Sequence, residues 1–233
     1  TASFIVKQTI ARSLSACNSL TSVHQALTDA FCKAQDALTD RMTEDTSLNG
    51  MGSTPVVVLV NKKSSFIAHV GDSRFYHISR GKLQWRTTDH SLVSELVQTK
   101  ALTEEQARVS PQSNVVTRAL GATNNHTPDI KEICYEKGDR FVVCTDGVWG
   151  SMPSATLFKK ISAVADSSVI VMALQDEVDV IGTQEGGGHD NHSIAIIDFN
   201  ENSQKTNLMI KKLKGIIAVL LFLMIIFFFV FIT

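Results

Sequence analysis

Hydrophobic residues recur at three- and four-residue spacing over residues 3–39, and this spacing predicts two amphipathic helices. Ser22, with Gln25 three residues later, predicts a capping box at the start of the second helix. From residue 55 onward the pattern changes to short apolar runs separated by polar turns, which is typical of strands. We expect these strands over 55–60, 65–70, 74–79 and 82–87, paired in order as an antiparallel meander.

The second half of the chain alternates between helical and strand patterns. Residues 92–99 predict a short helix, and Thr103 with Gln106 predicts a capping box before the next one. Glycines within 182–189 predict a flexible loop before the last strand. Helices, then antiparallel strands, then helices indicate an α+β domain built in layers. The other expected strands span 130–135, 140–144 and 193–199, and the other expected helices span 154–164 and 168–180.

The C-terminal end follows neither pattern. No polar side chain occurs from Ile216 to Ile232, and with Gly215 this run reaches the short end of the roughly 17–25 residues that span a bilayer. A buried core helix is the alternative, but a segment that is apolar on every side fits poorly in a domain of this size. We therefore expect a transmembrane helix over 215–233, embedded in the lipid bilayer, and a basic juxtamembrane linker over 200–214.

Lysine residues indicate the orientation of this expected span. Lys211, Lys212 and Lys214 precede the apolar run that ends at Ile232, whereas only Thr233 follows that run. An excess of lysine marks the cytoplasmic side of a membrane protein. We expect a single-pass membrane protein whose residues 1–199 face the cytoplasm.

Composition narrows the class of protein. The chain has 233 residues, of which 44% are hydrophobic and 19% charged, with a formal net charge of -1. This is a globular composition, and the balanced charge argues against a nucleic-acid partner. The cysteines lie far apart with no C-x-x-C, so neither a zinc site of that spacing nor a disulfide scaffold is expected.

Two aspartates lie at the ends of expected strands. Asp146 follows the strand at 140–144 and precedes a glycine, and Asp190 lies between the glycine-rich loop and the last strand. Strand ends can hold carboxylates against a hard divalent cation such as Mg²⁺ or Mn²⁺. Asp-Gly and Asp-Asn are also common turn formers, so their position alone leaves both interpretations open.

Several short strings occur in a characteristic order along the chain. They are Gly50-Met51-Gly52-Ser53-Thr54, His69-Val70-Gly71-Asp72-Ser73-Arg74, Thr88-Asp89-His90-Ser91-Leu92-Val93, Arg118-Ala119-Leu120-Gly121, Cys144-Thr145-Asp146-Gly147-Val148-Trp149 and Gly188-His189-Asp190-Asn191. In this order they resemble the metal-dependent protein serine/threonine phosphatases of the PP2C type (the PPM family), in the bacterial style. The resemblance covers residues 1 to about 199 and implies a phosphatase domain with the αββα arrangement, a four-layer β-sandwich flanked by helices.

The resemblance also implies a metal site at one end of the sandwich. It would hold two Mn²⁺ or Mg²⁺ ions, with Asp146 and Asp190 matching metal-binding aspartates of the family. Asp89, in Asp-His-Ser, matches a position that helps to hold a third, weaker ion in bacterial members. Residues 91–125 match the mobile flap beside the active site, where substrates are selected, whereas Arg74 matches a structural turn.

The implied activity is hydrolysis of phosphoserine and phosphothreonine in proteins by water that two metal ions activate. No covalent phosphoenzyme is needed, and no side chain is expected to act as the catalyst. His90 and His189 stand beside two of the predicted ligands and are candidates to orient them. The expected partners are phosphorylated proteins, the substrates of a serine/threonine kinase.

One part of the family pattern does not occur in this sequence. The family begins with a strand that carries an acidic residue and a second strand that ends in Asp-Gly-Met-Gly-Gly-His, whose aspartate bridges both ions. Here Asn49 precedes Gly50, and residues 2–6 resemble the helix that follows that motif. We therefore expect the chain to start after these two strands and, as it stands, to bind a metal pair weakly. A catalytically impaired relative, acting as a membrane-tethered binding or regulatory module, is the alternative.

Overall fold

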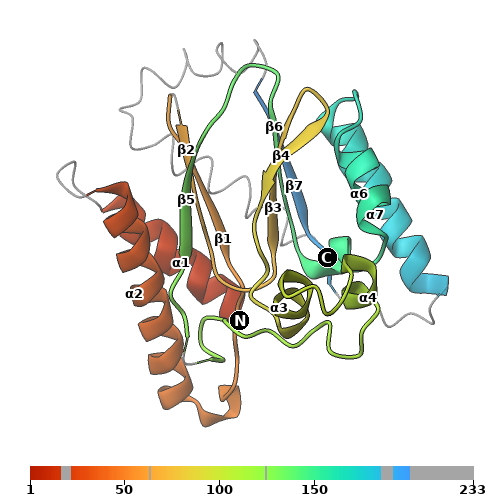
Figure 1. The fold of residues 1–233 in the computed structure, drawn as a ribbon. Coiled ribbons are helices and arrows are strands. Elements are labelled where there is room, and N and C mark those ends of the chain that lie inside the picture. The colour runs from red at the N-terminus through yellow and green to blue at the C-terminus, as the bar shows by residue number, and fades with distance from the viewer. Residues whose placement is uncertain (17–21, 63, 124, 185–190, 200–233) are drawn as a thin grey trace. The chain divides into compact units, whose positions relative to one another are not determined.

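The structure is a computed structural model that describes residues 1–16, 22–62, 64–123, 125–184 and 191–199 (Figure 1). The described residues form two compact units. The first comprises residues 1–71 and 116–135, and the second comprises 72–115 and 136–199. Each unit contains one antiparallel sheet and its own helices, so each is described by itself.

The first unit begins with the two predicted helices, α1 (Ala2–Ser15) and α2 (Val23–Glu44), followed by the 3-10 helix η1 (Thr46–Leu48). The hydroxyl of Ser22 accepts the backbone N–H of Gln25 at 3.2 Å, as predicted. The Gln25 side chain instead donates to Asp29 at 2.7 Å. The N-cap is therefore present, but the reciprocal half of the capping box, in which the Gln25 side-chain oxygen would accept the Ser22 N–H, is not.

The sheet of the first unit has the strand order β1-β2-β5, with β1 (Val56–Val60), β2 (Ser64–His69) and β5 (Asp129–Cys134). The predicted hairpin of β1 and β2 is confirmed, with Val57 opposite Ala68. Both residues belong to the core that the two helices make with one face of this sheet. The fully buried members of that core include Ile10, Leu27, Phe31, Leu38 and Leu120.

The predicted meander is wrong between the second and third strands. The free edge of β2 pairs with β5, and the third strand belongs to the other sheet. Gly71, directly after β2, has φ +99, and a Cβ there would lie 2.2 Å from the Thr54 side chain. Only glycine tolerates this conformation and this close approach, so the chain leaves the sheet here.

The sheet of the second unit has the order β4-β3-β6-β7. Its strands are β3 (Arg74–Ser79), β4 (Lys82–Arg86), β6 (Arg140–Cys144) and β7 (Ile194–Asp198), and all neighbours are antiparallel. Helices α6 (Ser154–Ile161) and α7 (Ser167–Gln184) pack against one face of it (Figure 1). The buried side chains between helices and sheet include Ile78, Val142, Leu157, Leu174 and Val178.

Short helices complete the second unit: α3 (Leu92–Gln98), α4 (Glu104–Arg108) and α5 (Asp146–Trp149). The capping box of Thr103 and Gln106 is confirmed at the start of α4. The predicted glycine loop is wrong over its first residues, because α7 continues through Gly182 to Gln184, and the rest of that prediction lies mostly outside the described residues. Gly182 is buried, and burial of a helix face outweighs the roughly 1 kcal/mol that glycine costs in a helix.

The α+β class predicted from the sequence is confirmed, since both units combine an antiparallel sheet with helices. The helices within the described ranges include none that is long and apolar enough to cross a membrane. The linker predicted over 200–214 and the span predicted over 215–233 lie outside the described residues.

Phe31→Ala tests the core of the first unit. Because Phe31 is fully buried among the helices and the sheet, its loss should lower the free energy of unfolding by about 3–5 kcal/mol. Phe4→Ala, on the 45% exposed phenylalanine of α1, is the matched control and should cost about 1 kcal/mol or less. Urea denaturation of both variants measures this difference, and equal losses would contradict the assignment of the core.

Candidate active site

Asp146 begins α5, directly after the buried strand β6. Its carboxylate accepts the backbone N–H of Gly147 at 3.0 Å, and its carbonyl oxygen accepts that of Gly150 at 2.7 Å. Thr145 joins the end of β6 to the chain before β7, because Ser193 donates to its hydroxyl at 2.9 Å and its own N–H donates to Ser193 at 3.0 Å. Asp146 therefore follows a strand end that the Thr145–Ser193 hydrogen bonds hold in place, and its own bonds to Gly147 and Gly150 fix the turn after it.

A pocket of about 240 Å³ opens beside Asp146. Its walls come from α5 and the loop after it, from α7, and from the segment predicted to be the flap. The lining residues are Arg108, Ser113, Asn114, Asp146, Gly147, Trp149, Gly150, Ser151, Val178, Ile181 and Gly182. The pocket thus combines one carboxylate, one guanidinium and several small polar groups, a set suited to a cation and a phosphate group.

The donor chemistry at Asp146 fits a hard divalent cation, since Mg²⁺ and Mn²⁺ bind carboxylate oxygens. Asp190, the second predicted ligand, lies outside the described residues. Within the described ranges, no group of three or more His, Cys, Asp or Glu side chains close enough to share an ion includes Asp146 or Asp89. The described part of this pocket therefore contributes one of the predicted ligands, Asp146.

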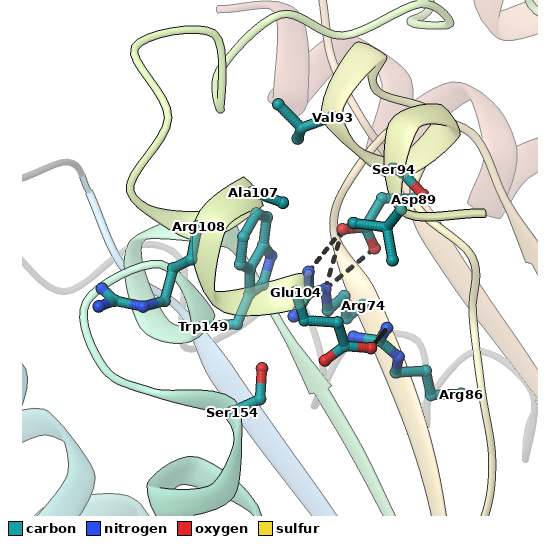
Figure 2. A pocket seen from close by; sticks show the side chains of 11 residues that line it. Arg74, Arg86, Asp89, Val93, Ser94, Glu104, Ala107, Arg108, Trp149 and Ser154 are labelled. Carbon is teal, nitrogen blue, oxygen red and sulfur yellow. Dashed lines mark hydrogen bonds and ion pairs between the residues drawn. The ribbon is translucent and has the colours of Figure 1, made fainter. Parts of the chain in front are cut away.

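Asp89 lies in an ion pair with Arg74 (Figure 2). The Arg74 Nε donates to both carboxylate oxygens at 2.9 and 3.1 Å, and Nη2 donates to Oδ2 at 2.6 Å. The guanidinium lies over the ring of Trp149, 3.7 Å from its centroid, and the Trp149 indole N–H donates to the Asp72 carbonyl at 3.0 Å. Asp89 thus forms a buried ion pair with Arg74, and its role in binding a third metal ion remains a prediction.

Burial and neighbouring charges shift the pKa values of Arg74 and Cys144 in this cluster. Burial opposes the charge of Arg74, but the hydrogen bonds and charge of Asp89 outweigh it and raise the pKa of Arg74. Burial raises the pKa of the nearby Cys144 thiol to about 12; Arg74 opposes this rise, and the carboxylates of Asp89 and Asp146 add to it. A thiol with this pKa stays protonated at neutral pH, so Cys144 is not a nucleophile.

The two histidines predicted to orient the metal ligands are not among the residues that line this pocket within the described ranges. His90 is buried, and His189 lies outside the described residues. Sequence reasoning missed Arg108 and Asn114 as lining residues of the Asp146 pocket. In the sequence, the only indication for these two residues is that they lie within the expected flap. They reach the pocket beside α5 because the folded chain brings distant segments together.

Comparison with known proteins identifies the family. The profile of the protein phosphatase 2C family matches residues 3–178. The protein phosphatase PhpP of Streptococcus pneumoniae serotype 2 is 30% identical over 161 residues, which cover 69% of this chain and 63% of that protein. The chain therefore spans about 63% of the length of this relative.

Solved structures show the same fold. The crystal structure of the serine/threonine phosphatase PstP/Ppp of Mycobacterium tuberculosis has a TM-score of 0.74 and 25% identity, covering 86% of this chain and 82% of that chain. The catalytic domain of PstP in complex with two manganese ions has a TM-score of 0.67 and 22% identity, covering 84% and 79%. The chain belongs to the protein phosphatase 2C family, and its fold is the α+β fold of these phosphatases.

Asp89→Asn tests the structural role of the ion pair. Removing the carboxylate charge leaves Arg74 buried without its counter-charge, which should destabilise the protein by about 3–5 kcal/mol in the absence of metal. The matched control is Asp129→Asn, because Asp129 pairs with Arg118 at 2.8 Å at a more exposed position; there the loss should be about 1 kcal/mol or less. Urea denaturation of both variants in a chelator decides the matter, and equal stabilities would contradict the structural role.

Proposed function

We propose that the protein carrying this domain is a metal-dependent protein phosphatase that hydrolyses phosphoserine and phosphothreonine. The observation that carries the proposal is the placement of Asp146 at the end of β6, facing a pocket of about 240 Å³. Membership of the protein phosphatase 2C family supports it. The substrates would be phosphorylated proteins, the products of a serine/threonine kinase.

Asp146 and Asp190 would hold two Mn²⁺ or Mg²⁺ ions, and Asp89 would contribute to a third. When bound, such ions supply Lewis acidity to the phosphate group and to water. The chain's own contribution begins with Asp146, whose carboxylate accepts the Gly147 N–H and whose backbone carbonyl accepts the Gly150 N–H, so that the carboxylate is held at the pocket. Arg108 also lines this pocket, with its guanidinium paired to Glu105.

Cys144 is buried and is not among the described residues that line the Asp146 pocket, which supports a reaction in which water attacks phosphorus directly, without a phosphoenzyme on that residue. The αββα stacking of the two sheets is also part of the proposal. The fold similarity to PstP/Ppp, at a TM-score of 0.74 over 86% of this chain, supports it.

The alternative function is a catalytically impaired relative that acts as a membrane-tethered binding or regulatory module. The relatives compared above are named as phosphatases, not as inactive relatives. A hydrolysis assay separates the two functions.

We also propose that residues 215–233 anchor the protein in a membrane, with the phosphatase domain on the cytoplasmic side. The apolar run from Ile216 to Ile232 and the lysines before it support this proposal.

In the whole protein, extended upstream of residue 1, Asp146→Asn should lower Mn²⁺-dependent hydrolysis of a phosphothreonine peptide by at least about a hundredfold, because the metal contributes several kcal/mol to the transition state. Calorimetric titration with Mn²⁺ should show weaker binding by the same variant. Asp176→Asn, on the exposed surface of α7, is the matched control and should leave both measurements unchanged. Full activity in the Asp146 variant would remove this residue from the site, and inactivity of the unaltered protein with normal Mn²⁺ binding would favour the impaired relative.

Deleting residues 215–233 tests the anchor. The full chain should remain with the membrane fraction after an alkaline carbonate wash, because an apolar helix of this length partitions strongly into lipid. The shortened chain should appear in the supernatant. Immunoblotting of the two fractions measures the distribution, and an equal distribution of both chains would contradict the proposed anchor.

A further inference from the structure

Arg108, the last residue of α4, contacts the loop that follows the Asp146 helix. Its Nη1 donates to the carbonyl oxygen of Gly150 at 3.0 Å. Its Nε and Nη2 donate to Glu105, one turn back on α4, at distances from 2.6 to 3.1 Å. The Arg108 side chain is 21% exposed, so its charge-assisted bond to Gly150 is largely shielded from water and correspondingly strong.

Gly150 connects this contact to Asp146. The Gly150 N–H donates to the Asp146 carbonyl at 2.7 Å, and this bond closes the single turn of α5. A Cβ at Gly150 would lie 2.8 Å from the same carbonyl oxygen. A side chain at this position would therefore press on the Asp146 carbonyl. The Gly150 N–H and the Gly150 carbonyl thus join Asp146 on one side and Arg108 on the other.

The other end of α4 is attached to the sheet. Glu104 accepts from Arg86 of β4 at 2.7 Å (Figure 2). The capping box of Thr103 and Gln106 closes the first turn of α4. In Figure 2 the Arg108 side chain extends from α4 to the side opposite the Arg74–Asp89 pair. The helix therefore has one attachment to the sheet and another to the turn that carries Asp146.

We propose that Arg108 is a positioning residue for Asp146: by holding Gly150 from α4, it keeps the α5 turn in the conformation that presents the Asp146 carboxylate to a metal ion. The metal ion in this inference comes from the proposed function. The contact between Arg108 and Gly150 can be tested without measuring phosphatase activity. If α4 is displaced, the Asp146 carboxylate is held less firmly. The affinity for the metal ion then depends on the position of the flap.

Arg108→Met tests this role, because methionine keeps much of the apolar volume and removes every donor. Amide hydrogen exchange, measured without metal, should be faster by about tenfold at Gly150, the expected effect of losing one hydrogen bond to a charged group. The dissociation constant for Mn²⁺, measured by calorimetry, should rise by about the same factor. Gly150→Ala, which pushes the backbone away from Asp146, should produce the same two changes with Arg108 intact.

The matched control is Arg41→Met, since Arg41 also pairs with a glutamate three residues away, Glu44, on the surface of α2. It should change neither measurement. Unchanged exchange at Gly150 in Arg108→Met would overturn the proposal, as would faster exchange spread evenly over the core or an unchanged affinity for Mn²⁺. A wild-type protein that binds Mn²⁺ but hydrolyses no phosphopeptide would contradict the proposed function alone. Hydrogen exchange at Gly150 and the dissociation constant for Mn²⁺ would still test the role of Arg108.

Discussion

A buried arginine and its counter-charge determine where the Asp146 turn lies. Arg74 starts β3 with a side chain only 11% exposed, and an unpaired guanidinium at that depth is strongly destabilising. Asp89 provides the counter-charge through both carboxylate oxygens, and the guanidinium lies over the Trp149 ring. Since Trp149 ends the helix that Asp146 begins, and its indole bonds to the Asp72 carbonyl, the position of α5 relative to the sheet follows from the burial of this one charge.

The two walls of the Asp146 pocket differ in how firmly they are held. The side formed by β6 and α5 is attached through buried contacts, namely the Thr145–Ser193 bonds and the Trp149 ring. On the opposite side, α4 has a single short turn that would not persist in isolation, and its ion pair from Glu104 to Arg86 is partly exposed. Partly exposed pairs contribute about 1 kcal/mol or less, so the Glu104–Arg86 pair adds little to the attachment of α4, which depends more on the bond from Arg108 to Gly150.

Many elements could be predicted from the sequence because their signals are local. The periodicity of α2, the β1–β2 hairpin and the capping box at Thr103 were all confirmed. The errors arise where distant segments compete. The meander fails because β5, far along the chain, takes the edge of β2, and α7 continues past its expected end because packing outweighs the low helix propensity of Gly182. In the site, Asp146 was predicted as a ligand from its place after an apolar strand together with the resemblance of the string around it to the family, whereas Arg108 has no comparable local signal.

The sequence by itself determined the types of the elements, the family, and the presence of an aspartate at the end of β6, since periodicity and short strings depend only on near neighbours in the chain. Only the tertiary structure decided which strands pair, that Asp89 is the counter-charge of Arg74, and that Arg108 reaches Gly150. These last contacts join residues 15 and 42 positions apart. Their physical basis is the burial of charge and of backbone polar groups, and which groups become buried together is settled only when the sheets and helices have packed.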